Sequence, residues 1–300
     1  MFNETHDRDV WRWYYTLCAI AAANMVLLII RILSIDPKDR YAKIMKFLGI
    51  PWVFECIWRS IFPSLYLQRF VWWDTVLNSI ILDRSLACVG ELCWVSQFTS
   101  AMVFLDRQIH SRRGGGGGHS SIRLLAFASF TTYVAAECVS YYNVATTNEY
   151  YAALEVVLDG IAFVILLPGY LYLWALCPGS MLQSRTKIFL GATAITCVVY
   201  PAYNFFIDAP MYMARYHEDE RNHKSYFPFW EGLKDASVRR IQTHAYDDWY
   251  QDMTWMVLYF SLGAWSGLLL MDGPRLGHFI SPAPSKGIRL EKAPFLTEKA

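Results

Sequence analysis

Residues 151–176, YAALEVVLDGIAFVILLPGYLYLWAL, form a long and almost entirely apolar stretch. The stretch is longer than the ~20 mostly apolar residues that an α-helix needs to cross a bilayer. Its only charged residues are Glu155 and Asp159. A stretch of this kind is typical of a transmembrane helix, so we expect an all-α membrane protein.

Other stretches of the chain repeat this pattern. Five more are long and apolar enough to span a membrane, namely 11–33, 85–105, 122–143, 187–207 and 252–271. A further stretch, 47–66, is apolar but carries Glu55, Arg59 and Pro63. From its own composition it is either a span or an interfacial helix.

Basic residues in the loops indicate that 47–66 crosses the membrane. Cytoplasmic loops are enriched in Lys and Arg. One basic cluster follows the first span and another follows 85–105; they comprise Arg31, Lys38, Arg40, Lys43 and Lys46, and Arg107, Arg112, Arg113 and Arg123. Both loops lie inside only if the chain crosses twice between them, so 47–66 supplies the second crossing. We predict about seven transmembrane helices, with the N-terminus outside and the C-terminus cytoplasmic.

The domain organisation follows from these spans. We expect one transmembrane domain, residues 1–272, followed by a cytoplasmic tail, 273–300. The aromatic content of 208–250 predicts an ordered outer cap, because disordered segments are poor in aromatic residues. Segment 67–84 is expected to lie on the same face. The Gly-rich loop 108–121 is predicted to be a flexible cytoplasmic linker.

Two glycines of the last predicted span, Gly263 and Gly267, are four residues apart. Small residues at this spacing allow the backbones of two helices to approach closely. We therefore expect another helix, of this chain or of a second one, to pack on this face.

The overall composition supports a membrane protein. The chain has 300 residues, of which 55% are hydrophobic and 18% are charged, whereas about 25% are charged in soluble domains. The net charge of +1 gives no basis for binding nucleic acid. The expected partners are membrane lipids and a hydrophobic small molecule, and the oligomeric state is not predicted.

Acidic residues within the apolar stretches are the main functional signal. A carboxylate in hydrocarbon costs ~2.5–3.5 kcal/mol on insertion scales, so such residues usually face the interior of a bundle and often mark function. Glu155 and Asp159 are four residues apart and share one helix face. Two close carboxylates in low dielectric do not both ionise cheaply. We predict that they form a catalytic acid–base pair, unless Glu155 is half solvated near the membrane surface.

Two further acids are predicted to be catalytic, as groups that orient or protonate a substrate. Glu137 lies on a helix face between Tyr133 and Tyr141, and Glu91 lies one turn before Trp94. Tyr133, Tyr141 and Trp94 are the expected substrate-binding residues beside these acids. The alternative is that both acids only tie helices together.

Asn204 and Asp208 are also predicted to bind substrate. They are four residues apart at the end of the span 187–207, after Pro201. Proline kinks a helix and frees backbone carbonyls that can line a cavity. Arg59 is expected to pair with one of the buried acids.

The histidines argue against several classes of metal enzyme. Histidine-box desaturases and intramembrane zinc hydrolases need clustered imidazoles. All the histidines lie outside the predicted spans, at His6, His110, His119, His217, His223, His244 and His278. The chain has no phosphate-binding loop or dinucleotide fingerprint. We therefore predict no cofactor and no metal site.

The expected architecture resembles that of the small integral-membrane terpene cyclases of fungi. Those proteins are also described as seven-span and use acidic residues to protonate an epoxide or an alkene. The resemblance lies in the architecture and in the acids beside aromatic residues, and no motif is aligned. It implies carbocation chemistry, in which a protonated carboxyl group and aromatic faces act in an apolar pocket.

The leading hypothesis is therefore a membrane-embedded enzyme that acts on a lipid or isoprenoid-type substrate. One alternative is a proton- or cation-coupled transporter or channel, in which the same carboxyl groups load and release protons or cations. Another is a receptor-like or structural membrane protein. Retinal binding is excluded because the last span has no lysine.

Overall fold

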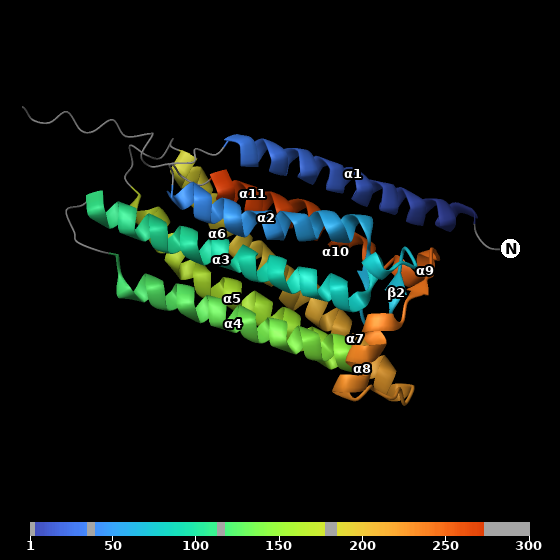
Figure 1. Cartoon of the computed structure of the whole chain (residues 1–300). Coiled ribbons are helices and arrows are strands. Elements are labelled where there is room, and N and C mark those ends of the chain that lie inside the picture. The colour runs from blue at the N-terminus through green and yellow to red at the C-terminus, as the bar shows by residue number, and fades with distance from the viewer. Residues whose placement is uncertain (1–3, 35–39, 113–117, 178–184, 273–300) are drawn as a thin grey trace, which may run out of the picture.

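The structure, a computed structural model, describes residues 4–34, 40–112, 118–177 and 185–272. Long helices run side by side in one bundle (Figure 1). The first five are α1 (Glu4–Ser34), α2 (Arg40–Ile61), α3 (Ile80–Arg112), α4 (Ser120–Thr146) and α5 (Glu149–Leu176). The sixth is continuous through α6 (Arg185–Tyr203), the π-helical turn η3 (Asn204–Asp208) and α7 (Ala209–Arg221). The last consists of α10 (Met253–Leu258), the π-helical turn η4 (Tyr259–Gly263) and α11 (Ala264–Asp272).

Six helical segments of the described chain are long and apolar enough to cross a membrane. They are Arg8–Ser34, Ile80–Ser111, Ser120–Thr146, Glu149–Leu176, Thr186–Arg221 and Met253–Met271. Each contains most of one of the six clear stretches found in the sequence. The chain is therefore consistent with an all-α, multi-pass membrane protein.

Helix α2 is not among those six, because charged residues such as Lys46, Glu55 and Arg59 interrupt its apolar sequence. It nevertheless packs along the bundle against α1, α3 and α11 (Figure 1). Glu55 and Arg59 are buried, so the charges within its second half face the interior of the bundle.

One end of the bundle carries a small folded unit, which we call the cap. The cap contains β1 (Ser64–Leu65), β2 (Phe70–Val71), η1 (Val76–Asn78), α8 (Phe229–Val238), β3 (Ile241–Gln242) and α9 (Tyr246–Trp249). Strand β2 pairs antiparallel with β1 and parallel with β3. The segment after α2 and the segment after α7 are thus joined at the same end of the molecule (Figure 1).

Several boundaries differ from the sequence predictions. Asp83 and Arg84, expected in an outer segment, lie in α3 and are buried. Residues 209–221, expected in a loop, form α7 and extend the sixth long helix. Of the predicted linker 108–121, residues 108–112 are helical, while 113–117 and the predicted tail, 273–300, lie outside the described residues.

The prediction of close packing at Gly263 and Gly267 is confirmed. Both glycines face Trp52 of α2, whose Nε1 donates a hydrogen bond to the Gly263 carbonyl at 2.9 Å. A Cβ atom at position 267 would lie only 2.3 Å from Trp52 Cδ1. Glycine therefore allows the last long helix, α10–η4–α11, to pack on α2.

Candidate functional site

Two arginines lie inside the bundle, among carboxyl groups from four helices. Arg59 of α2 and Arg84 of α3 are only 5% and 3% exposed. The carboxyl groups around them, which we call the acid cluster, belong to Glu55, Asp83, Glu91, Glu137, Glu155 and Asp159. The cluster brings together all four acids that the sequence analysis selected as catalytic.

Arg84 connects three of those four acids. Its Nη2 donates to Glu91 Oε2 at 2.8 Å and also to Glu137 Oε2. Its Nη1 donates to Glu155 Oε1 at 3.3 Å. Because these acids belong to α3, α4 and α5, one guanidinium ties three helices together. Sequence analysis missed this residue by starting the span at residue 85, although Arg84 lies two turns before Glu91 on the same helix.

Arg59 pairs with Glu55, Asp83 and Glu91. Its Nη1 donates to Glu55 Oε1 at 2.9 Å and lies 3.9 Å from Glu91 Oε1, while its Nε lies 3.5 Å from Asp83 Oδ1. The prediction that Arg59 pairs with buried acids is thus confirmed. The Tyr66 and Phe260 rings lie 5.3 Å from its Cζ, close enough for cation–π attraction.

The charges of the acid cluster do not balance. Six carboxyl groups face two guanidinium groups, which leaves four excess negative charges if every carboxyl group is ionised. Uncompensated charges in a low-dielectric interior are strongly unfavourable. The cluster therefore has a physical reason to hold exchangeable protons.

A cavity of about 640 Å³ opens beside the acid cluster. Arg84, Glu91, Glu155 and Asp159 line its polar part. Apolar side chains of α6 and of the last long helix, α10–η4–α11, line another part. Several of them are exposed on the bundle surface: Ile195, Val199, Leu258, Leu262 and Leu269. The cavity thus joins an apolar lateral opening to buried carboxyl groups.

Glu155 and Asp159 have different surroundings within this cavity. Glu155 is held by Arg84 and by Asn143, whose Nδ2 donates to Glu155 Oε2 at 3.3 Å. Asp159 is 7% exposed, and its Oδ1 has no hydrogen-bond partner in the described part of the chain. A buried, unpartnered carboxyl oxygen that lines a cavity is suited to contact a ligand.

Aromatic rings form a fixed wall of the cavity. Trp94 stacks on Trp52 with ring centroids 4.6 Å apart, and Tyr200 meets Trp94 edge-on at 5.3 Å. Trp94 Nε1 also donates to Ser266 Oγ at 2.8 Å. Tyr259 donates to Glu91 Oε1, which links this wall to the acid cluster.

The other predicted substrate-binding residues divide into two groups. Asn204 and Asp208 line the cavity, and Asn204 Nδ2 donates to the Val156 carbonyl at 3.1 Å. They belong to η3, the π-helical turn that follows Pro201. Tyr133 and Tyr141 are not among the residues that line the cavity.

Glu137, also predicted to be catalytic, does not line the cavity either, but it contacts two residues that do, Arg84 and Glu91. Tyr141 donates to Ser85 Oγ at 3.0 Å, and Tyr133 is fully buried. Within the expected polar stripe Tyr133–Glu137–Tyr141, Glu137 and Tyr141 thus contact Arg84 and Ser85 of α3.

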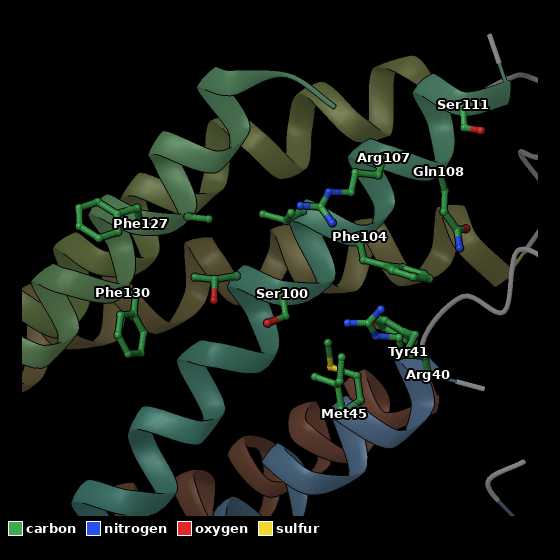
Figure 2. Close-up of a pocket in the computed structure, with 14 residues that line it drawn as sticks. Arg40, Tyr41, Met45, Ser100, Phe104, Arg107, Gln108, Ser111, Phe127 and Phe130 are labelled. Carbon is green, nitrogen blue, oxygen red and sulfur yellow. The ribbon is translucent and has the colours of Figure 1, made fainter. Parts of the chain in front are cut away.

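A second cavity of about 760 Å³ lies between α2, α3 and α4 (Figure 2). Arg40 and Arg107 reach into it, together with Ser100, Phe104 and Phe127. No carboxyl group is among the described residues that line it, so it lacks the groups needed for acid–base chemistry.

Buried rings fill the bundle near both cavities. Trp52, Trp94 and Phe98 are at most 2% exposed, and Phe98 meets Trp94 edge-on at 5.6 Å. No residue lines both cavities within the described part of the chain. These two cavities are therefore lined by separate sets of residues.

Comparisons of this chain with protein-family models, with curated proteins and with solved structures gave no match.

Proposed function

We propose that this protein is a membrane-embedded enzyme that performs acid–base chemistry on a lipid or isoprenoid-type substrate. The observation that carries the proposal is the cavity that joins an apolar lateral opening to the unpartnered carboxyl group of Asp159. A cavity of about 640 Å³ lies within the ~300–1,000 Å³ range of small-molecule sites.

We further propose that α2 is a seventh span, with the cap outside and the C-terminus cytoplasmic. Support comes from its outer face, where Ile44, Phe47 and Phe54 are apolar and exposed. Its charged residues Glu55 and Arg59 pair with each other inside the bundle, as polar groups of membrane helices usually do. The basic residues of the loops favour the same topology.

The substrate would approach from the bilayer between α6 and the last long helix, α10–η4–α11. Val199 and Leu262 are 59% and 55% exposed and also line the cavity. The apolar part of the substrate would therefore pass from lipid to the site without crossing a polar surface. The opposite part of the cavity offers Arg84, Asn204 and Asp208 to a polar head group.

In the proposed reaction, Asp159 donates its proton to an epoxide oxygen or an alkene carbon of the substrate. Protonation breaks the C–O bond of the epoxide or the π bond of the alkene and leaves a carbocation. The aromatic rings of Trp94 and Tyr200 stabilise this cation. Glu155, one turn away and held by Arg84, accepts the proton that the product cation loses. Proton transfer between Glu155 and Asp159 then restores the starting state, so no external oxidant or reductant is needed.

A proton-coupled carrier is the second candidate, favoured by the excess of carboxyl groups over arginines. A carrier of this kind loads its solute or ion from water. The cavity instead has an apolar lateral opening, lined by exposed side chains such as Val199 and Leu262, which favours the enzyme.

A comparison of cells tests the proposal. Lipids and apolar small molecules are profiled in cells that express the wild-type chain, Asp159→Asn or Asp74→Asn; Asp74 is 59% exposed in its side chain and pairs with Arg240 at the surface. We expect a new product with wild type and Asp74→Asn, and none with Asp159→Asn. Uptake that requires a pH gradient in liposomes, with no product in any cells, would support the carrier instead.

A further inference from the structure

We propose that Asp106, His110 and His119 form a binding site for a first-row divalent metal ion of the zinc type. The site lies where α3 ends and α4 begins. It is separate from the acid cluster, and the proposal does not rest on the proposed enzyme activity.

The three side chains converge on one point. Asp106 Oδ1 lies 3.1 Å from His110 Nδ1 and 3.2 Å from His119 Nδ1. One ligand atom from each residue lies within 4.8 Å of those of the other two. The two imidazole rings are 4.0 Å apart and perpendicular, so their nitrogens approach the carboxylate from different directions.

These separations suit a shared ion. Two ligands at ~2.0–2.1 Å from zinc and at a tetrahedral angle are roughly 3.3 Å apart, close to the distances of 3.1 and 3.2 Å observed here. Two imidazoles and one carboxylate are a common donor set for zinc and related ions, with water completing the coordination. Direct hydrogen bonds from the histidines to Asp106 are the alternative explanation of the same distances. His110 Nδ1 also lies 3.0 Å from the Asp106 backbone carbonyl oxygen, a contact that metal binding at this nitrogen would replace.

The surroundings of Asp106 also point to an ion. Its carboxylate is 1% exposed in its side chain, and its only ion-pair partners among the described residues are the two histidines. The backbone N–H of His119 donates to Oδ2 at 2.7 Å, which fixes the carboxylate and leaves Oδ1 for a metal. The Tyr172 hydroxyl lies 3.2 Å from His119 Nε2, as an outer partner that orients a ligating imidazole.

The chain is shaped to bring His119 to this position. A Cβ atom at Gly118 would lie 2.0 Å from Asp106 Oδ2, so only glycine allows this close approach. Asp106 and His110 are one helical turn apart, while His119 follows the glycine run. An ion would therefore fasten the end of α3 to the start of α4. The sequence prediction of no metal site treated this run only as a flexible linker.

Metal binding to the full chain in detergent tests the proposal. The protein is stripped with chelator and dialysed against ZnCl₂, and bound zinc is counted by mass spectrometry. We expect about one zinc per wild-type chain, and at least ~10-fold weaker binding in His110→Ala and in His119→Ala. His217 is an exposed histidine of α7, so His217→Ala is the matched control and should bind zinc as wild type does.

A second measurement does not depend on the variants. Cobalt added to the stripped wild-type chain should give the visible absorption of a nitrogen- and oxygen-coordinated ion, and zinc should abolish it. Less than one zinc per three chains, or equal affinity in wild type, His110→Ala and His119→Ala, would overturn the proposal and leave the histidines as hydrogen-bond partners of Asp106.

Discussion

Replacement of Arg84 by methionine should destabilise the bundle strongly. The guanidinium makes charged contacts with Glu91, Glu137 and Glu155, and it is 3% exposed. Removal of one partner of a buried ion pair costs ~3–5 kcal/mol, because the remaining charge is left uncompensated. At roughly 2 °C per kcal/mol for a chain of this size, Arg84→Met should lower the midpoint of thermal unfolding by about 6–10 °C.

The assay is thermal unfolding of the purified chain in detergent, followed by intrinsic tryptophan fluorescence. Arg123→Met is the control, since Arg123 is exposed on α4, and it should unfold within ~1 °C of wild type, as surface substitutions usually do. In the double variant Arg84→Met/Glu137→Gln one excess carboxylate is gone. It should therefore be more stable than the sum of the single effects predicts, by ~1 kcal/mol or more.

Two results would refute this reasoning. If Arg84→Met unfolded within 2 °C of wild type, the guanidinium would not hold the three helices together. If the double variant showed the simple sum of the two single effects, Arg84 and Glu137 would not interact energetically.

Three further predictions concern the opening of the cavity, helix packing and the cap. Val199→Trp should narrow the opening and reduce product formation in cells at least ~10-fold, with unchanged thermal stability. Val198 is exposed but does not line the cavity, so Val198→Trp should leave product formation unchanged. Equal loss of product in both variants would argue against lateral access. Gly267→Ala should cost ~1–3 kcal/mol in thermal unfolding because its Cβ would meet Trp52, while Gly191→Ala, with no atom within 4 Å, should not destabilise; equal stability would contradict the close packing. Arg69→Met should expose the cap to limited proteolysis, because Arg69 is buried, pairs with Asp235 at 2.9 Å and donates to the Val144 carbonyl at 2.9 Å; an unchanged digestion pattern would show that Arg69 does not attach the cap.

Arg69 also shows how the cap is held. Burial lowers the pKa of its guanidinium, and the hydrogen bond and charge of Asp235 raise it, so the ion pair offsets part of the desolvation. Its φ of 59° is left-handed, which is unusual for a residue other than glycine. The turn between β1 and β2 therefore accepts backbone strain to direct this side chain toward α8.

The helices were predictable from the sequence because apolar length alone marks a candidate span. Helix α2 needed a second argument from loop charge, since Glu55 and Arg59 interrupt its apolar sequence. The cap was beyond sequence reasoning in detail. Its β2–β3 pairing joins Phe70 to Ile241 through two-residue strands, which are too short to leave a periodic pattern.

The acids of the site were predictable because carboxyl groups in hydrocarbon are costly and therefore conspicuous. Arg84, which pairs with three of these acids, was not predicted. The expected start of α3 was a few residues too late, and this placed Arg84 in a loop. Of the aromatic residues predicted to bind substrate, Trp94 lines the cavity, and Tyr133 and Tyr141 are not among its lining residues. Helical spacing tells which residues share a face, whereas the neighbouring helix decides what that face meets.

The most direct test of the central claim is turnover by the purified chain in nanodiscs with no ion gradient. A lipid extract from cells that lack the protein serves as the substrate pool. Wild type and Asp74→Asn should convert one apolar component, and Asp159→Asn should do so at least ~100-fold more slowly, the usual effect of losing a general acid. Conversion by Asp159→Asn at the wild-type rate, or no conversion by the wild-type chain, would contradict the central claim.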